Sequence, residues 1–255
     1  SNRFDSVRAD RTTAKLTAMG TLKDGGVCVK ITSSASKESV FEVFDGARFS
    51  RFPQAMPESD RDYSVLFAAQ NGDLWLGGRD VALCRDGKWQ TFVSNDKTTP
   101  ENAAGFTELA DGRIWCGTPD KIWEFNGKDW AVVRAGFDHL HRVIRGADGS
   151  VWAASDGGVH RFWQGAWIDN QMDEGVPDGG VNEIDEDQQG RIRAATSRGV
   201  IQYFPASDTD PPKTGVQKLM AEDRPLLEGD TLSLLFNSQD KWKFTPRDRL
   251  LYSYR

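Results

Sequence analysis

The sequence of 255 residues has little of the chemistry that builds metal centres, disulfide frameworks or membrane spans. Its three cysteines, Cys28, Cys84 and Cys116, form no C-x-x-C pair, and so low and odd a number does not indicate a disulfide framework. Histidine also occurs only three times. No stretch approaches the roughly 20 apolar residues that a membrane helix needs. We therefore expect no metal, no cofactor and no membrane-spanning segment within the chain.

A positive charge excess is missing as well. Lysine and arginine number 32 against 38 aspartates and glutamates, which gives a net charge of −6 and a pI of about 5.2. An acidic chain is a poor match for polyanions, so nucleic acid and anionic membrane surfaces are not expected as partners. Hydrophobic residues make up 38% and charged residues 27%, a globular rather than a disordered composition.

What the chain does have is a repeat. One pattern of a turn glycine, an apolar residue, a Trp and then small residues recurs in the segments 71–78, 111–118 and 148–155. Divergent copies at 24–32 and 189–196 have Cys28 and Arg193 in place of the Trp. The turn glycines Gly25, Gly72, Gly112, Gly149 and Gly190 are spaced by 37 to 47 residues. A period near 40 predicts one four-stranded β-propeller blade per repeat.

Each repeat has the same internal plan of strands and tight turns. First strands are predicted at 63–69, 105–109, 140–145 and 181–185, and third strands at 40–44, 81–85, 122–125, 159–162 and 200–204. Asx-Gly and Gln-Gly pairs between the strands suit hairpin turns, because these residues accept a positive φ. The dense turns leave no room for helices.

The tryptophans follow the repeat and are expected to fill the space between stacked blades. Those in register are Trp75, Trp115 and Trp152 on second strands, and Trp89, Trp130 and Trp167 on fourth strands. Trp123 and Trp163 break this register, which makes them better candidates for exposure than the others, although burial is still the expected state of both. The cysteines occupy core positions of the repeat and are predicted to be small buried side chains.

After the repeats the composition changes at the Pro-rich segment 207–213. Strands are predicted beyond it at 215–220, 231–237 and 250–254. The predicted fold class is therefore all-β: a β-propeller of at least five blades of about 40 residues, with a partial C-terminal β-sandwich. The propeller would span residues 1–206, a linker 207–215, and the sandwich segment 216–255. Residues 2–15 either add a strand that closes the ring or end a preceding blade.

The repeat pattern Asp-Gly-x-apolar-Trp-apolar-Gly-Thr, followed by a Gly-apolar-x-x-aromatic strand, resembles the two-component regulator propeller repeat over residues 17–205. Cys28 and Arg193 depart from its Trp position. Residues 240–255, with Tyr252 and Tyr254, are similar to the first half of the triple-tyrosine β-sandwich that follows such propellers. This resemblance implies a periplasmic or extracellular location at the inner membrane of a bacterium, a glycan or small polar ligand, and membrane and output domains downstream of the chain.

No catalytic constellation is visible, so the segment is not predicted to be an enzyme. His139 and His141 flank Leu140 and share one strand face, which makes them a possible metal pair that lacks a third ligand. His160 is predicted to be structural. The acidic turn 185–190 faintly resembles a calcium loop, but lacks its Asp-x-Asp-x-Asp-Gly core and its distant Glu. It is better explained as a solvated hairpin turn.

Propeller geometry predicts where a ligand would bind. Loops that enter the first strands, and loops between second and third strands, gather at one end of the axis. Their mixed charges suit a polar ligand. The candidate ligand-binding residues are Tyr63, Arg79, Asp80, Phe106, Asp120, His139, His141, Arg142, Asp156, Asn182 and Arg198.

Three functions remain open from the sequence. The leading one is a non-catalytic extracytoplasmic sensor that binds a ligand and signals through the adjoining sandwich. The second is a protein–protein interaction or dimerisation scaffold, which includes self-association through the C-terminal segment. The third is a propeller lyase or glycosidase, which needs convergent carboxylates or histidines at the axis.

Overall fold

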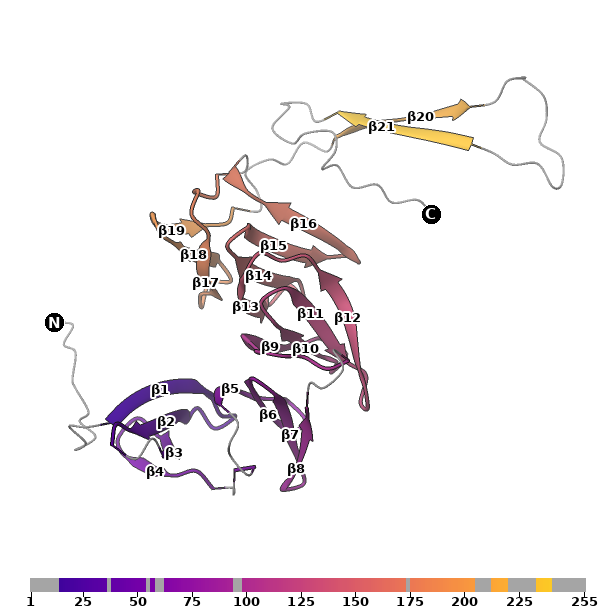
Figure 1. The fold of residues 1–255 in the computed structure, drawn as a ribbon. Helices are drawn as coiled ribbons and strands as arrows, with labels where there is room; N and C mark the ends of the chain where they lie inside the picture. The colour runs from indigo at the N-terminus through magenta and orange to yellow at the C-terminus, as the bar shows by residue number, and fades with distance from the viewer. Residues whose placement is uncertain are drawn as a thin grey trace.

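The computed structural model describes residues 14–35, 38–53, 56–57, 62–93, 98–172, 175–204, 212–219 and 233–239. The elements in these residues are β-strands, grouped into five successive antiparallel sheets and a separate hairpin (Figure 1). The predicted all-β propeller architecture is thereby confirmed. No helix among the described residues is long and apolar enough to cross a membrane.

Each sheet is one blade, and its strands pair in chain order. Blades 1 and 2 consist of β1 (Ala14–Thr21), β2 (Val27–Ser33), β3 (Ser39–Phe44) and β4 (Phe49–Arg51), then β5 (Tyr63–Ala68), β6 (Leu74–Gly78), β7 (Val81–Arg85) and β8 (Lys88–Phe92). Blades 3 and 4 consist of β9 (Gly105–Glu108), β10 (Ile114–Gly117), β11 (Lys121–Phe125) and β12 (Trp130–Ala135), then β13 (Leu140–Arg145), β14 (Val151–Ser155), β15 (Gly158–Trp163) and β16 (Ala166–Asn170). Blade 5 has β17 (Val181–Glu186), β18 (Ile192–Thr196) and β19 (Gly199–Gln202).

The turns between strands have the backbone geometry that their residues predict. Gly72, in the turn between β5 and β6, has a φ of 94°, and Asp86 and Gly87, between β7 and β8, have φ values of 50° and 74°. Such positive φ values suit Gly and Asx and create the tight reversals that keep each blade antiparallel.

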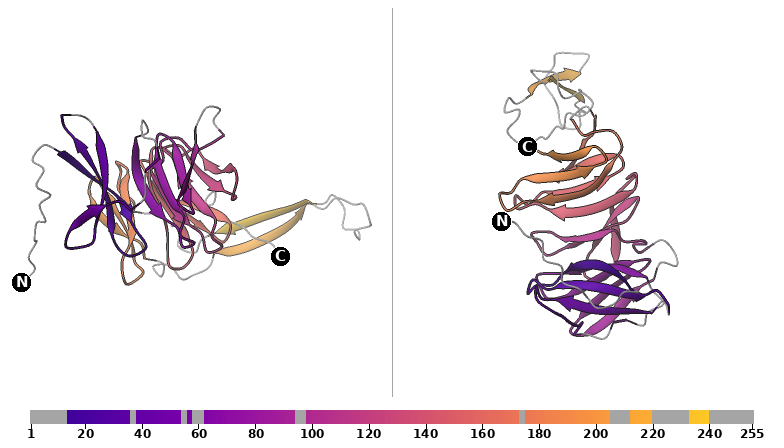
Figure 2. Two further views of the ribbon diagram at one scale, coloured as in Figure 1. Left: turned by 90° about the horizontal axis from the view of Figure 1, so that it is seen from below. Right: turned by 90° about the vertical axis from the view of Figure 1, so that its left-hand side faces the viewer.

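The blades stand side by side in an arc. The first strands β1, β5, β9, β13 and β17 lie innermost, and each packs against the next. Figures 1 and 2 show the five sheets following one another, with a gap between blade 1 and blade 5. A hydrophobic core fills each space between neighbouring blades, and Trp75 and Trp152 are both 1% exposed there. The arc is therefore held by contacts between successive blades.

At one position between blades 1 and 2, two backbones approach so closely that only glycine can be accommodated. A Cβ added to Gly20 of β1 would lie 1.9 Å from the carbonyl oxygen of Leu66 in β5. Only glycine therefore fits where these two inner strands meet.

Trp123, one of the two tryptophans that the sequence marks as the better candidates for exposure, is buried. Its indole is 6% exposed and lies in the core between blades 2 and 3, where Nε1 donates to Thr118 Oγ1 at 3.3 Å. Trp123 occupies the same place in its third strand as Ala82 and His160 do in theirs, because each pairs with the residue that follows the repeat tryptophan of the second strand. This interior position holds Ala, Trp or His in different blades. A search for tryptophans that recur in register therefore does not identify it as a core position. Trp163 is half-buried.

The C-terminal hairpin consists of β20 (Lys213–Leu219) and β21 (Ser233–Gln239), close to two of the three strands expected there. Both strands are largely exposed, including Val216, Leu234, Leu235 and Phe236. A lone hairpin rarely has independent stability. The third predicted strand, at 250–254, and the tyrosines Tyr252 and Tyr254 lie outside the described residues, as does most of the linker.

Candidate functional site

Two histidines and an aspartate meet at the loop end of blade 4. The rings of His139 and His141 stack with centroids 5.6 Å apart, so they share one face as the strand alternation predicts. His141 Nε2 lies 2.8 Å from Asp156 Oδ1, which follows β14. His139 has a φ of 50°, a left-handed backbone that is uncommon outside glycine. These side chains come from the two loop types that the sequence predicts to converge.

The next inner strand adds a second charged pair. Arg142 of β13 approaches Glu183 of β17, with Nε 3.3 Å from Oε1. His139, His141, Arg142, Asp156 and Glu183 together form a mixed-charge surface across two blades, here called the blade 4/5 rim. Its side chains are partly exposed, so they are open to a ligand. Asn182 is exposed beside Glu183 and belongs to the same surface.

A cavity of about 540 Å³ runs along the inner strands below this rim. Arg142 and Arg145 of β13 line it together with Phe106, Glu108 and Glu186. The two glutamates are held by backbone donors of the preceding blade, because the N–H of Gln70 donates to Glu108 at 2.7 Å and that of Ala147 to Glu186 at 2.8 Å. The Nε of Arg145 is buried without a partner among the described residues. This cavity, here called the axial cavity, thus offers two carboxylates held in place and two guanidinium groups.

The other predicted residues are spread over the fold. Tyr63 is 1% exposed and packs between blades 1 and 2, so its side chain belongs to the core. Phe106 is 6% exposed and reaches only the axial cavity. Asp80 is buried as well. The exposed residues Arg79, Asp120 and Arg198 lie on separate loops, and Asp120 pairs with Lys121 at 2.8 Å.

The structure also joins three residues that the sequence analysis does not link. His160 Nε2 lies 2.7 Å from Ser155 Oγ, and His160 Nδ1 lies 2.6 Å from Asp169 Oδ1. Hydrogen bonding from His160, aided by Arg134, lowers the pKa of Asp169. Ser155 is 0% exposed and its Oγ accepts the N–H of Gly157, so no substrate carbonyl can reach it. Ser155, His160 and Asp169 are hydrogen-bonded in the same order as a catalytic triad. Here these bonds connect β14, β15 and β16 of blade 4 and have a structural role.

The signal for this network was present in the sequence. The Gln164-Gly165 turn fixes a hairpin in which His160 pairs directly with Asp169. His160 is also buried, as a structural histidine should be.

The carboxylate of Asp187 in the acidic turn 185–190 is paired with arginine side chains. Asp187 accepts hydrogen bonds from the N–H groups of Gln189 and Arg191, and pairs with the guanidinium groups of Arg191 and Arg193. A carboxylate neutralised in this way is not available to calcium. No group of three or more His, Cys, Asp or Glu side chains suited to a metal occurs in the part of the chain that the structure describes.

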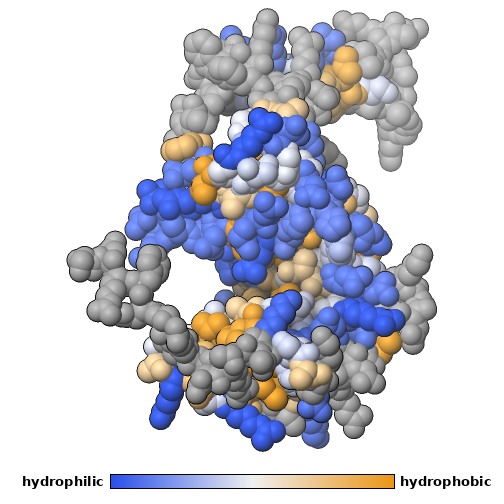
Figure 3. Space-filling view, turned by 60° about the vertical axis from the view of Figure 1, so that its left-hand side comes forward, coloured by the Kyte–Doolittle hydropathy of each residue, from blue (hydrophilic) through white to orange (hydrophobic). Residues whose placement is uncertain are grey.

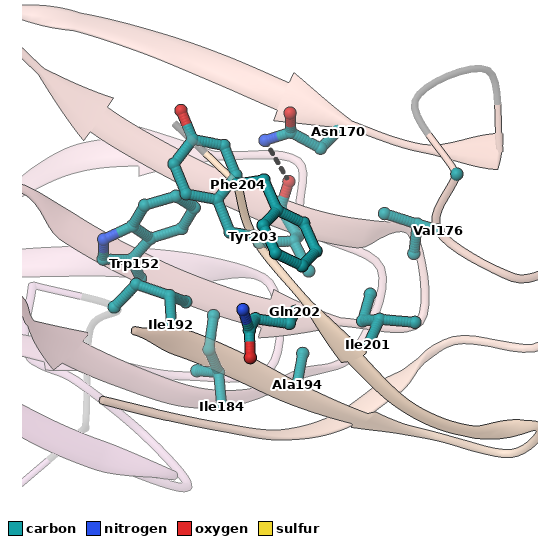
Figure 4. Close-up of a pocket in the computed structure, with 12 residues that line it drawn as sticks. Trp152, Asn170, Val176, Ile184, Ile192, Ala194, Ile201, Gln202, Tyr203 and Phe204 are labelled. Carbon is teal, nitrogen blue, oxygen red and sulfur yellow. Dashed lines mark hydrogen bonds between the residues drawn. The ribbon is translucent and has the colours of Figure 1, made fainter. Parts of the chain in front are cut away.

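A second, apolar cavity of about 300 Å³ lies between blades 4 and 5. Figure 4 shows Trp152 and Tyr203 on one side of it and Ile184, Ile192, Ala194 and Ile201 around it. Asn170 closes one end, and its Nδ2 donates to Val159 O at 3.3 Å. Its lining is mostly hydrocarbon, so it is chemically unlike the rim.

These features define the chain as a β-propeller with cavities along and between its blades. No family model matches it, and no curated protein is similar enough in sequence to match. Among solved structures, it is similar to the extracellular domain of a proposed hybrid two-component system, BT3049, from B. thetaiotaomicron, with a TM-score of 0.62 and 13% identity over 87% of this chain. The extracellular domain of BT4673 from the same organism matches 95% of this chain with a TM-score of 0.55 and 13% identity.

The chain spans about a third of the length of these two structures, 32% and 35% respectively. A structure described as a gluconolactonase is also similar, with a TM-score of 0.51 and 14% identity over 77% of this chain and 80% of that one. At such identities the likeness shows the fold.

Proposed function

We propose that this chain is part of the extracytoplasmic sensor region of a bacterial two-component-type signalling protein, and that it binds its cue without turning it over. The fold likeness to extracellular domains of two such systems supports this proposal, as does the repeat pattern. The observation that carries it is the blade 4/5 rim above the axial cavity, where charged side chains of neighbouring blades converge.

The cue that fits this arrangement is a small polar molecule with several hydroxyl or carboxylate groups, such as an oligosaccharide fragment. Arg142 and Arg145 supply donors to oxygen atoms, and Glu108, Glu186 and Asp156 supply acceptors to hydroxyl groups. These groups lie on blades 3, 4 and 5, so a ligand that bridges blades 4 and 5 would favour one blade 4/5 spacing over another. Residues 216–255 are proposed as the start of the sandwich that receives this change, at the outer face of the inner membrane.

The test is a thermal-shift screen of the chain against neutral and acidic oligosaccharides. A binder present at about 100 times its Kd stabilises the fold by roughly 2.7 kcal/mol, which raises the melting temperature by several degrees. Arg142→Ala should abolish the shift. Arg48→Ala, at an exposed turn of blade 1 far along the arc from the rim, is the matched control and should keep it.

A ligand that is bound and recovered intact supports the sensor. A ligand that is consumed, with loss of turnover in Arg142→Ala, would instead favour a propeller enzyme, the possibility that the gluconolactonase-like fold raises. A chain that binds no oligosaccharide but self-associates would favour the interaction scaffold.

A further inference from the structure

One position of the repeat lies at the end of each inner strand, next to the turn of the preceding blade. It is the last residue of the inner strand that pairs with the second strand. In blades 2 to 5 this position holds Ala68, Glu108, Arg145 and Glu186. The residue type therefore determines which hydrogen-bonding groups a blade offers at this place.

In blades 3 and 5 the residue at this position is a glutamate that accepts a hydrogen bond from the preceding blade. Glu108 Oε2 accepts the N–H of Gln70 at 2.7 Å, and Glu186 Oε2 accepts the N–H of Ala147 at 2.8 Å. Each donor lies two residues after the same repeat position of its own blade. The repeat thus uses one carboxylate–amide contact twice, and has room for a carboxylate at this place.

Blade 4 has an arginine at the same position. Arg145 carries donors only, so it cannot accept the N–H of Ala110, which is the residue of blade 3 that corresponds to Gln70. β13 packs against β9 as β9 packs against β5, so the relation between the blades is kept. The N–H of Ala110 has no acceptor among the described residues. Blade 4 therefore presents donors, and no acceptor, where its neighbours have a carboxylate.

The guanidinium of Arg145 lacks a counter-ion as well. Its Nε is buried without a hydrogen-bond partner, and the side chain forms no ion pair with the residues that the structure describes. The other arginine of the axial cavity, Arg142, is paired with Glu183. A buried donor without an acceptor costs free energy. A ligand that supplies an acceptor to Arg145 recovers this free energy.

The chemical group that fits these donors is a carboxylate. Its planar shape allows two parallel hydrogen bonds with a guanidinium, and its oxygens have further lone pairs for the N–H of Ala110. Glu108 and Glu186 also line the axial cavity. Their charges repel a doubly charged phosphate more strongly than a singly charged carboxylate.

The rest of the axial cavity suits a sugar ring. Its volume is about 540 Å³, and Phe67 and Phe106 line it together with the two glutamates, so it combines apolar surface with acceptors for hydroxyl groups. The cavity lies along the inner strands of the arc. Figure 3 shows a hollow between the two ends of the arc, with mostly hydrophilic residues above it.

We infer that the axial cavity binds a sugar acid, namely a uronic acid or an oligosaccharide that contains one, with its carboxylate between the guanidinium of Arg145 and the N–H of Ala110. This inference rests on the proposed sensor function and names the ligand class. In blade 4, the carboxylate of the ligand takes the place that the carboxylate of Glu108 has in blade 3.

Arg145→Gln tests the assignment without a ligand. The amide oxygen of glutamine accepts the N–H of Ala110, as Glu108 accepts that of Gln70, and no unpaired charge remains. The melting temperature should rise by about 2–4 °C. Arg48→Gln, at an exposed turn of blade 1, is the control and should change it by about 1 °C or less. A lower melting temperature in Arg145→Gln would show that Arg145 stabilises the fold, and would overturn the inference.

Calorimetric titration with digalacturonate and with its dimethyl ester tests the carboxylate directly, because the two probes share a skeleton and differ in charge. The parent chain should bind the acid at least about tenfold more tightly than the ester. Arg145→Gln should bind both equally, with an affinity for the ester within about twofold of the parent. Arg48→Gln should keep the preference for the acid.

The outcomes separate this inference from the proposed function. A parent chain that binds neutral oligosaccharides, but shows no preference for the acid over the ester, keeps the proposed function and contradicts the carboxylate site. A chain that binds neither neutral nor acidic oligosaccharides contradicts both. A sulfated disaccharide that binds as tightly as digalacturonate, with the same dependence on Arg145, would show a general anion site and overturn the assignment to a carboxylate.

Discussion

A few buried polar side chains and thiols determine how the free energy of unfolding depends on mutation and on pH. Ser155, His160 and Asp169 are a hydrogen-bonded set inside one blade, and Arg134 of blade 3 joins it through an ion pair with Asp169 at 2.9 Å. The guanidinium of Arg134 also lies 4.7 Å from the ring of Phe137. A set of this kind stabilises only when all its members are present, because each leaves a buried partner behind when removed.

His160→Ala should therefore lower the free energy of unfolding by about 2–4 kcal/mol, since it leaves Ser155 unsatisfied and opens a cavity. The measurement is urea unfolding followed by tryptophan fluorescence. His141→Ala, which removes a half-exposed histidine with one partner, serves as control and should cost about 1 kcal/mol or less. Equal losses in the two variants would contradict a structural role for the buried network.

The buried thiols predict alkaline destabilisation. Burial raises the pKa of Cys28 to about 11 and that of Cys116 well above its ordinary value. In the folded state these thiols stay neutral, whereas in the unfolded chain they ionise near the ordinary thiol pKa of 9.0. The stabilisation is thus complete below pH 9 and is lost as the pH rises, by at most about 1.4 kcal/mol per pH unit for each thiol.

Unfolding curves between pH 8 and 10.5 check this slope. The double variant Cys28→Ser, Cys116→Ser should lose most of the pH dependence in this range, even if its stability at pH 8 is lower. A slope unchanged from the parent chain would place the titrating groups elsewhere.

At the scale of strands and blades, the packing between inner strands tolerates the least change in side-chain size. Gly20→Ala should destabilise blade 1 by several kcal/mol, because its Cβ meets the backbone oxygen of Leu66, which cannot move independently of β5. Gly105→Ala, on the inner strand of blade 3, is the matched control: its nearest neighbours lie 3.9 Å away, an ordinary contact. In thermal unfolding, Gly20→Ala should have a clearly lower melting temperature than Gly105→Ala.

The strands and their turns could be predicted from the sequence, because Asx-Gly turns and the tryptophan register are local signals. β7, for example, has the predicted bounds Val81–Arg85. The place of Trp123 in the repeat was not predicted, because this third-strand position holds Ala, Trp or His according to the neighbouring blade. The candidate site was predicted in part: His139, His141, Arg142 and Asp156 meet, but Tyr63 lies in the core. Which loop side chains turn outward depends on tertiary packing.

At the scale of the whole molecule, the arc predicts a gradient of local stability. Blade 3 has a neighbour on both sides, whereas blades 1 and 5 each present one uncovered face in this structure. Stability in repeat architectures is approximately a sum over neighbouring units. Amide hydrogen exchange should therefore be slowest in β9, β10, β13 and β14 and faster in β3 and β19.

The direction of the aromatic contacts between blades has a consequence for biosynthesis. Phe125 and Trp130 dock on Trp75, and Phe162 and Trp167 dock on Trp115, so blades 3 and 4 each rest on a tryptophan that lies earlier in the chain. A ribosome that releases the chain from its N-terminus presents every new blade with a folded surface that is already waiting for it. The molecule can thus be assembled in the order in which it is translated, ending with Tyr203 of blade 5 against Trp152 of blade 4.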